Sequence, residues 1–424
     1  MKITHCRITP IAFRDPPLLN VQGVHQPWAL RSIIELGTDT GLVGLGESYG
    51  DKDVLEDLEE AREAVLGLDP FATNVLRQRL SEVLMPRTHA GMALAPGTHG
   101  NKALEKVFAA LEVAMLDLQG QTLGKPVHEI LGGAIRGNIP YSAYLFYKFA
   151  HHKDDPYAPD PWGEVLTPEQ MVGETRQMID EYGFGSIKLK GGVFEPELEI
   201  ETMKELHGAF PNYPLRIDPN GGWDVGTSIR AGRALKGTLE YLEDPTPTLE
   251  GMARVAKEVS MPLATNMVVT NFAHFPEAIR LGSVQVILSD HHYWGGLRAT
   301  QILARHCQTF GLGLSMHSNS HLGISLAAMT HVAATIPNLT YACDTHYPWQ
   351  EDEIIAGGKL KFDGGSLTIS DKPGLGVTLD YAALEKLHQN YLTCGIRKRN
   401  DALEMQKYYP GWQAKLPRFL EGTG

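Results

Sequence analysis

The first fifty residues alternate apolar and polar side chains, which is the pattern of half-buried β-strands. Three such runs occupy residues 3–13, 28–39 and 41–50, and the turn residues Asp39, Thr40 and Gly41 separate the last two. From about residue 52 to 132 the apolar positions recur at helical spacing, as in NKALEKVFAALEVAMLDLQG. Strands followed by helices predict an antiparallel meander within a separate α+β domain.

From residue 139 the pattern changes to short β-rich runs, each followed by helical spacing. The eight runs are IPYSAYLFY, GSIKLK, LRID, LEYLED, PLATN, VQVILSD, LGLSMH and LTYACDTH. This repetition of βα units is typical of a parallel sheet and predicts a (β/α)₈-type barrel. One helix start is well marked, because Thr167 offers an N-cap, Pro168 a first helical residue and Gln170 the partner of a capping box.

These changes of pattern divide the chain into a capping domain over residues 1–132 and a barrel over residues 133–380. After Gly365 no further βα unit follows, and a helix is expected near 381–392. We expect this tail to pack back on the first domain, so that about 381–424 completes it. Two polar segments, 15–28 and 151–166, are long enough to reach over the mouth of the barrel.

Composition and charge narrow the range of partners. A formal net charge of −12, with acidic and basic residues mixed along the chain, argues against nucleic acid or an anionic membrane as a partner. The four cysteines, Cys6, Cys307, Cys343 and Cys394, lack the spacing of a zinc site or disulfide framework. No signal-peptide pattern and no run of about 18–20 apolar residues is found, which favours a cytoplasmic protein. No sequence feature fixes a symmetry, and a homo-oligomer is left open.

A charged or amide residue ends nearly every predicted barrel strand. In chain order these residues are Lys190, Asp218, Glu243, Asn266, Asp290, His317 and Asp344. Their spacings of 28, 25, 23, 24, 27 and 27 residues each match about one βα unit. Because barrel enzymes carry out their chemistry at the carboxyl ends of the strands, this register predicts an active site.

Asp218, Glu243 and Asn266 come from three adjacent strands and offer only oxygen ligands. Hard oxygen donors with open positions suit Mg²⁺, which keeps water or substrate oxygens in its coordination shell. Each residue alone is better explained as a strand-end cap or a surface ion-pair partner. Because all three residues end adjacent strands, we prefer a role as metal ligands for the set, and the sequence predicts a magnesium site.

His317 and Asp290 end neighbouring strands, so the carboxylate can hold the imidazole in one tautomer and make it a general base. A single histidine is more often a hydrogen-bonded loop residue, and His321 is assigned a structural role. Lys188 and Lys190 point to the same face of one strand. If that face is the barrel interior, each ammonium group is expected to lower the pKa of the other, which would let Lys190 act as a base while Lys188 stays cationic. The alternative is that both side chains extend outward to solvent.

Several longer motifs are specific to one family. They are KLK at 188–190, DPNGGW at 218–223, YLEDP at 241–245, ATNMVVT at 264–270, ILSDHHYWGG at 287–296, MHSNSHLGISLA at 316–327 and DTHYPWQ at 344–350. With these motifs the chain resembles the enolase superfamily and, within its mandelate-racemase-like branch, the glucarate dehydratases. Asn266 as a third ligand, where many relatives use a carboxylate, is typical of that group. The resemblance implies a modified (β/α)₇β barrel, closed over by the N-terminal meander and the C-terminal tail.

Carried to this chain, the resemblance implies that Lys190 and the His317–Asp290 pair stand on opposite faces of the substrate's α-carbon, with Lys188 at its carboxylate. The ligands of Mg²⁺ would be Asp218, Glu243 and Asn266. Contacts to the rest of a sugar diacid would come from His25, Tyr144, Phe146, Asn220, Ser318, Asn319, His346 and Arg399. Arg399 would clamp the distal carboxylate. In the segment where the family has substrate-contacting threonines, only Thr98 is a candidate.

The implied reaction is dehydration of D-glucarate or an epimer to a keto-deoxy-aldarate. Enolase-superfamily sites, with a lysine or histidine base and Mg²⁺ stabilising the enediolate, are an established example of this chemistry. A base removes the proton beside the carboxylate, and the β-hydroxyl then leaves with acid help from His317. Two alternatives stay open: a racemase or epimerase, since bases on opposite faces permit proton exchange without elimination, and a noncatalytic homologue that binds a diacid.

Overall fold

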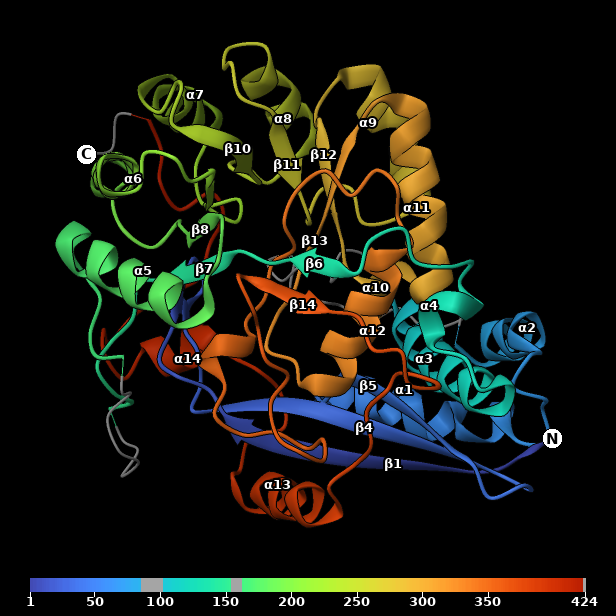
Figure 1. The fold of residues 1–424 in the computed structure, drawn as a ribbon. Helices are drawn as coiled ribbons and strands as arrows, with labels where there is room; N and C mark the ends of the chain where they lie inside the picture. The colour runs from blue at the N-terminus through green and yellow to red at the C-terminus, as the bar shows by residue number, and fades with distance from the viewer. Residues whose placement is uncertain (85–101, 154–161, 422–424) are drawn as a thin grey trace.

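The computed structural model describes residues 1–84, 102–153 and 162–421, and Figure 1 shows a strand meander beneath a barrel. The meander consists of β1 (Ile3–Arg14), β4 (Trp28–Thr38) and β5 (Val43–Tyr49), antiparallel in the order β1-β4-β5, as predicted. The polar segment between β1 and β4, predicted as a loop, contains a small hairpin of β2 (Leu19–Asn20) and β3 (Gly23–Val24).

Helices cover one face of this sheet. They are α1 (Lys52–Ala61), the 3₁₀ turn η1 (Arg62–Val65), α2 (Thr73–Leu84), α3 (Ala103–Leu123) and α4 (Val127–Ile130). α3 is buried along most of its length. It lies close to β5 because β5 carries glycine at the contact: a Cβ on Gly44 would lie 2.2 Å from the carbonyl oxygen of Ala114. Thr98 lies outside the described residues.

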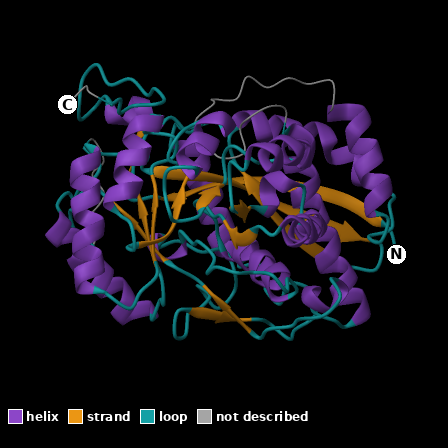
Figure 2. Cartoon of the chain, turned by 90° about the horizontal axis from the view of Figure 1, so that it is seen from above, coloured by secondary structure: helices purple, strands orange, loops and turns teal. Residues whose placement is uncertain are grey.

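Seven parallel strands form the barrel sheet, in the order β13-β12-β11-β10-β9-β8-β7. They are β7 (Ala143–Phe146), β8 (Ile187–Lys190), β9 (Leu215–Asp218), β10 (Leu239–Glu243), β11 (Leu263–Thr265), β12 (Val286–Ser289) and β13 (Gly313–Met316). Viewed from above, the strands lie inside and the helices outside (Figure 2). The outer helices are α5 (Pro168–Tyr182), α6 (Pro196–Ala209), α7 (Val225–Ala234), α8 (Leu249–Ala256), α9 (Phe275–Leu281), α11 (Leu297–Phe310) and α12 (Gly323–Ala334). The capping box of Thr167 and Gln170 is present at the start of α5.

The eighth β-rich run, residues 339–346, is not a strand, and the expectation of eight regular βα units is wrong at this point. The segment instead bridges the two edges of the sheet. On one side the backbone N–H of Asp344 donates to Met316 at 2.8 Å, and on the other the N–H of Ser142 donates to Cys343 at 2.9 Å. Thr340 also donates to Leu314 at 3.0 Å and Cys343 to Pro140 at 2.9 Å, so a few backbone hydrogen bonds on each side close the sheet, which fits the modified barrel that the family resemblance implies.

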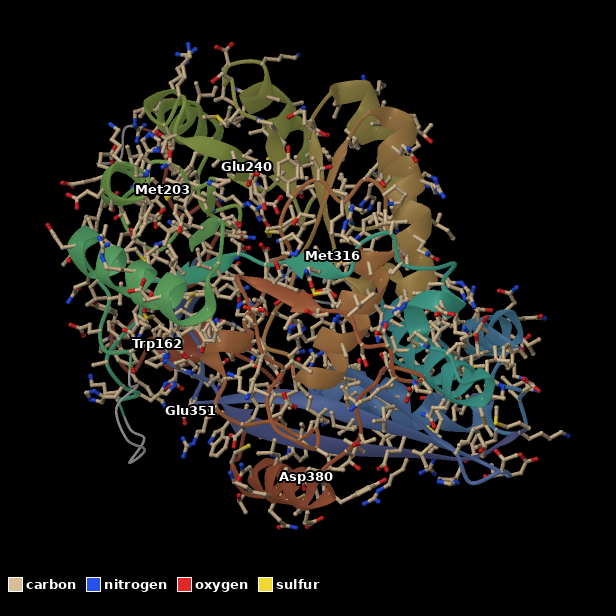
Figure 3. All side chains as sticks on the ribbon, in the orientation of Figure 1. Trp162, Met203, Glu240, Met316, Glu351 and Asp380 are labelled. Atoms are coloured by element: carbon tan, nitrogen blue, oxygen red, sulfur yellow. The ribbon has the colours of Figure 1, made fainter. Side chains whose placement is uncertain are left out.

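Shorter elements connect these parts. They are β6 (Asn138–Pro140), which pairs with β14 (Ser366–Thr368), and the turns η2 (Phe272–His274), α10 (His291–Trp294) and η3 (Tyr347–Trp349). In Figure 3, Met316 lies near the middle of the molecule, whereas Asp380 lies at the start of α13 below the sheet of the capping domain. None of the helices in the described ranges is long and apolar enough to cross a membrane.

The tail returns to the first domain. Helix α13 (Tyr381–Thr393) packs under β1, where His388 Nδ1 lies 2.7 Å from the carbonyl oxygen of Pro10 (Figure 1). Helix α14 (Asp401–Met405) lies beside β3. We therefore propose the division into a capping domain, 1–132 with about 381–424, and a barrel, 133–380.

Candidate active site

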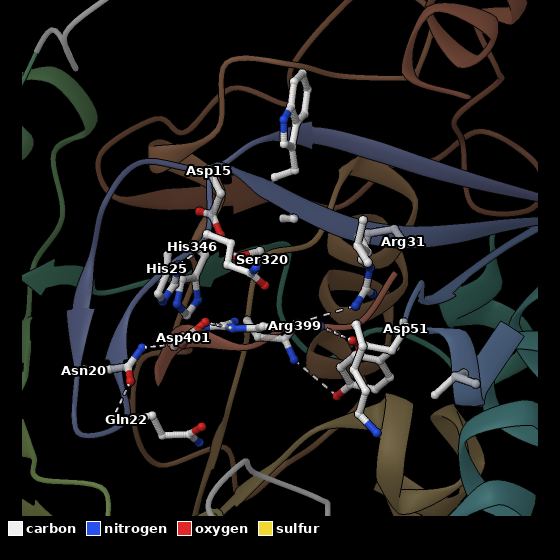
Figure 4. Close-up of a pocket in the computed structure, with 18 of the residues that line it drawn as sticks. Asp15, Asn20, Gln22, His25, Arg31, Asp51, Ser320, His346, Arg399 and Asp401 are labelled. Atoms are coloured by element: carbon white, nitrogen blue, oxygen red, sulfur yellow. Dashed lines mark hydrogen bonds and ion pairs between the residues drawn. The ribbon is translucent and has the colours of Figure 1, made fainter. Parts of the chain in front are cut away.

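A cavity of about 270 Å³ opens between the capping domain and the carboxyl ends of the barrel strands. Nine residues expected at the site line it: His25, Tyr144, Phe146, Lys190, Asn220, His317, Asn319, His346 and Arg399. Figure 4 shows residues of its wall, contributed by both domains. Six other expected residues are buried but do not line this cavity: Lys188, Asp218, Glu243, Asn266, Asp290 and Ser318.

The two lysines of β8 both face the barrel interior, where each meets a carboxylate. Lys190 Nζ donates to Asp218 Oδ2 at 2.6 Å and to Asn220 Oδ1 at 2.7 Å. Lys188 Nζ lies 2.6 Å from Glu243 Oε2 and 2.6 Å from Asp344 Oδ2. The alternative that these side chains extend to solvent is therefore wrong.

Lys188 is held as a cation. Burial alone would lower the pKa of Lys188, but the carboxylates of Asp344 and Glu243 outweigh it and raise the pKa well above its ordinary value. Its Nζ also lies 4.7 Å from the ring centroid of Tyr144, in cation–π geometry. The expectation that the two ammonium groups lower each other's pKa is wrong for Lys188, because the sequence did not indicate how closely three carboxylates surround it.

The loop after β8 is fixed by an acidic residue of the next helix. Glu199, on α6, accepts hydrogen bonds from the backbone N–H groups of Gly192, Val193 and Phe194 at 2.8–3.0 Å. Gly192 has a φ of +74°, and a Cβ there would lie 2.3 Å from the carbonyl oxygen of Pro219. Gly192 thus lets this loop pass against the loop that carries Asn220.

The residues proposed for Mg²⁺ fit such an ion. Asn266 Nδ2 donates to Glu243 Oε1 at 2.6 Å, while Asn266 Oδ1 is buried and has no hydrogen-bond partner among the described residues. A buried oxygen without a donor costs free energy unless a cation satisfies it. Carboxylate oxygens of Asp218, Glu243 and Asp244 lie within 4.8 Å of one another beside it. This all-oxygen set has the chemistry that Mg²⁺ prefers.

The pair expected to form the base lies at the ends of β12 and β13. His317 Nδ1 lies 3.0 Å from Asp290 Oδ2. Asp290 Oδ1 lies 2.7 Å from His292 Nδ1, so that one carboxylate stands between two imidazoles. Burial alone would raise the pKa of Asp290, but the neighbouring His292 and His317 outweigh it and hold the pKa well below its ordinary value. Because Nδ1 of His317 is engaged, its Nε2 is the nitrogen left for a ligand.

One wall of the cavity is aromatic. His346 packs against Tyr144 and Phe146, with ring centroids 4.8 and 5.2 Å away. Burial lowers the pKa of His346 well below its ordinary value, and nearby His25 and His317 act in the same direction. Ser318 does not reach the cavity itself: its Oγ accepts from the backbone N–H of His346 at 3.1 Å and so positions that residue.

Polar groups from the capping domain and the tail adjoin the aromatic wall, since the ring of His25 lies 5.9 Å from that of Phe146. His25 Nδ1 lies 3.0 Å from Asp15 Oδ2, which leaves Nε2 for a ligand (Figure 4). Arg399 donates from Nε and Nη2 to the two oxygens of Asp401, at 2.8 and 2.6 Å. A bidentate pair of this kind uses one edge of the guanidinium group and leaves Nη1 for a ligand.

Sequence reasoning missed two residues of the buried charge cluster. Asp344 was recognised as a strand-end residue but given no role, and it contacts Lys188 directly. Asp244 follows Glu243 in the YLEDP motif and has a φ of +36°, which is rare for a residue other than glycine. Thr265 Oγ1 and the backbone N–H of Asn266 donate to its carboxylate at 2.5 and 2.8 Å. The positive φ was not predictable from the motif.

Comparison with known proteins identifies the family. The Mandelate racemase / muconate lactonizing enzyme N-terminal domain model matches residues 4–132, and the Enolase C-terminal domain-like model matches residues 170–383. The chain therefore belongs to the enolase superfamily, in its mandelate-racemase-like branch. This confirms both the family resemblance and the barrel-and-cap fold.

Within that branch the chain is a glucarate-dehydratase-like enzyme. It is 49% identical to a "Probable glucarate dehydratase" of Streptomyces coelicolor over 428 residues, with 99% of each chain covered. A crystal structure of an enolase from Pseudomonas fluorescens, with bound magnesium, potassium and tartrate, shares 56% identity and a TM-score of 0.96 over 99% of each chain. An enolase structure from Thermobispora bispora, with magnesium and formate, shares 52% identity and a TM-score of 0.96 over 99% of this chain and 100% of that one.

Proposed function

We propose that this protein is a Mg²⁺-dependent dehydratase of a sugar diacid, D-glucarate or a close epimer. The observation that carries the proposal is that Lys190 and His317 line one cavity, while Lys190 also contacts Asp218, which belongs with Glu243 to a buried oxygen cluster that Asn266 joins through Glu243. Two groups able to move protons beside a cation site are what removal of a weakly acidic proton next to a carboxylate requires.

Asp218, Glu243 and Asn266 would hold Mg²⁺, with Asp244 beside them. When bound, the ion supplies positive charge to the substrate carboxylate as negative charge develops there. Lys188 adds a fixed positive charge beneath the same point, since its carboxylate partners keep it protonated. Related enolases with bound magnesium support this assignment.

The proton-moving groups have distinct tasks in this proposal. Lys190 Nζ or His317 Nε2 removes the proton from the α-carbon, depending on the configuration of the substrate. His317, oriented by Asp290, then donates a proton to the departing β-hydroxyl. The resulting enol gives the keto product, a keto-deoxy-aldarate.

The polar wall supports a diacid as substrate. Lys190, His25, Asn220, Asn319 and Arg399 all line the cavity and offer hydrogen-bond donors. Arg399 Nη1 would bind the distal carboxylate. The side chains of Tyr144 and Phe146, which adjoin His25, would exclude water from that part of the cavity.

The test is incubation of the purified protein with Mg²⁺ and D-glucarate, with the 2-keto product followed by semicarbazide. Turnover that is lost in a His317→Asn variant is the expected result. A panel of aldarates identifies the preferred epimer. Failure of every aldarate to give a keto product would overturn the proposal.

A racemase or epimerase is the second candidate, because both Lys190 and His317 line the cavity and could exchange the same proton. Proton NMR in D₂O separates the two reactions. Inversion or deuterium exchange at the α-carbon without elimination would favour the second candidate. Binding of glucarate with neither exchange nor elimination would indicate a noncatalytic homologue.

A further inference from the structure

The carboxylate that orients His317 is itself held from the capping domain, through a buried chain of side chains. Asp290 Oδ1 receives two hydrogen bonds from His292, one from the backbone N–H at 2.9 Å and one involving ring Nδ1 at 2.7 Å. The other ring nitrogen of His292, Nε2, lies 2.7 Å from Nη2 of Arg31 and 2.7 Å from the hydroxyl oxygen of Ser325, which can donate to it. Arg31 belongs to β4, in the sheet of the capping domain.

The chemistry of arginine fixes the direction of these hydrogen bonds. A guanidinium group can only donate, so His292 Nε2 accepts from Arg31. The ring proton of His292 is then on Nδ1, where it is donated to Asp290 Oδ1. This leaves Asp290 Oδ2 to accept from Nδ1 of His317, and Nε2 of His317 to face the substrate.

Arg31 is fixed in turn by Glu47 of β5. Arg31 Nε donates to Glu47 Oε1 at 2.9 Å, and Glu47 also accepts from the backbone N–H groups of Leu322 and Ser325 at 2.9 Å. Leu322 and Ser325 lie at the start of α12, directly after the loop that follows His317. Arg31, Glu47 and His292 are at most 3% exposed, so water does not compete with these contacts.

We infer that Arg31 and His292 are positioning residues for the His317 base: Arg31 sets the tautomer of His292, which holds Asp290 in the orientation that His317 requires. The capping domain thus takes part in proton transfer at His317, in addition to forming a wall of the cavity. The effect on turnover rests on the proposed function, whereas the tautomer does not.

The first test needs no substrate. In protein labelled with ¹⁵N-histidine, we expect the His292 ring to be protonated at Nδ1 and unprotonated at Nε2, with its signals assigned by their loss in His292→Asn. Arg31→Met removes the donor that keeps Nε2 an acceptor, so we expect Nε2 of His292 to become protonated toward Ser325 Oγ, while Nδ1 stays protonated toward Asp290. Arg136→Met removes an arginine that contacts only carbonyl groups at the end of α12, and should leave the His292 tautomer unchanged. Protonation of His292 at Nε2 in the unmodified protein would overturn the inference.

The second test compares two variants of His292 by α-proton exchange in D₂O. Asparagine can keep the donor that faces Asp290 Oδ1, whereas phenylalanine keeps ring volume and removes the donor. We expect His292→Phe to slow exchange at the His317 face about 10- to 100-fold with KM nearly unchanged, the range seen for partners that orient a reactive side chain. His292→Asn should retain most of the exchange rate at the His317 face. The rate of exchange at the Lys190 face should be unchanged in both His292 variants.

Equal losses in the two His292 variants, or equal losses at both faces, would contradict a positioning role and indicate a structural one. If Arg31→Met does not fold, the two His292 variants and Arg31→Lys, which retains a donor, decide the question. If no aldarate exchanges or turns over in the unmodified protein, the proposed function fails, and the tautomer measurement still tests the inference.

Discussion

The two lysines of β8 and the His317–Asp290 pair are held in position by different kinds of interaction. On the lysine side, two ammonium groups lie among the carboxylates of Asp218, Glu243 and Asp344, with contacts of 2.6 Å made within the barrel. On the histidine side, the carboxylate of Asp290 lies between the imidazoles of His292 and His317. Arg31 of the capping domain contacts His292, not the carboxylate itself. The lysine side therefore depends on the balance of charge, and the histidine side on orientation.

Removing one base at a time should give the largest difference between the lysine side and the histidine side. General acid–base groups contribute about 10²–10⁴-fold to rate. We expect Lys190→Met to slow α-proton exchange for one epimer of the substrate by a factor in this range. His317→Asn should slow exchange for the other epimer by a similar factor. NMR in D₂O with both epimers measures it. Equal losses for both epimers in both variants would mean that the bases do not act on separate faces.

Removal of the buried charge at Lys188 should have a large effect on stability. Lys188→Met removes the cation that lies 2.6 Å from both Glu243 and Asp344, leaving Glu243 without its ion-pair partner and Asp344 with Arg216 at 3.8 Å, and breaking a buried pair costs about 3–5 kcal/mol. The free energy of unfolding, measured in urea, should fall by this amount. The control is Lys386→Met: this lysine is 69% exposed in its pair with Asp352, and exposed pairs contribute about 0–1 kcal/mol. Similar losses in both variants would contradict the charge-balance interpretation.

The increase in Tm caused by Mg²⁺ should depend on the ligands beside the two lysines and not on Asp290. At a concentration of 100 times Kd, a ligand that binds only the folded state adds about 2.7 kcal/mol. We expect Mg²⁺ to raise Tm in the unmodified protein and in Asp290→Asn, and to lose this effect in Asn266→Ala. Thermal unfolding with and without EDTA measures it. A Tm that responds to Mg²⁺ equally in Asn266→Ala would exclude Asn266 as a ligand.

The smallest effect concerns pH and the histidine side. The folded pKa of Asp290 lies well below its ordinary value, whereas the unfolded value is about 3.9. Ionised Asp290 therefore contributes stability above about pH 4, and this contribution is lost as pH falls through the folded pKa. Asp290→Asn should be less stable than the unmodified protein at pH 7, by about 1–3 kcal/mol for a charged hydrogen-bonded group. Urea unfolding at several pH values should show the difference shrinking below pH 4, and a constant difference would contradict it.

Much of this site was predictable because barrel periodicity brings strand ends together. Lys190 and Asp218 end consecutive βα units and His317 ends a later one, and Lys190 pairs directly with Asp218 across β8 and β9. The eighth run, 339–346, was predicted as a strand because its residues favour β-structure, yet it makes a few backbone hydrogen bonds to each edge of the sheet without forming a regular strand. Local propensity carries no information about whether a neighbouring edge is in register.

The contacts that the sequence did not reveal are long-range ones between side chains. Arg31 and His292 are separated by 261 residues, and a buried arginine in an apolar meander has no local signature. The pKa of Lys188 was predicted in the wrong direction for the same reason, since its partners Glu243 and Asp344 come from β10 and the segment after β13. Without an alignment, pairing of this kind becomes visible only in three dimensions.

The return of the tail to β1 has a consequence for biosynthesis. Arg399 and Asp401 lie on the cavity wall but follow the whole barrel in the chain. At synthesis rates of about 5–20 residues per second, the strands that carry Lys190 and His317 leave the ribosome seconds before the tail does. A barrel that folds before the tail emerges therefore has a cavity without the part of its wall that Arg399 and Asp401 form. The wall of the cavity is complete only after the tail has been synthesised and α13 has packed under β1, because Arg399 and Asp401 follow α13 in the chain.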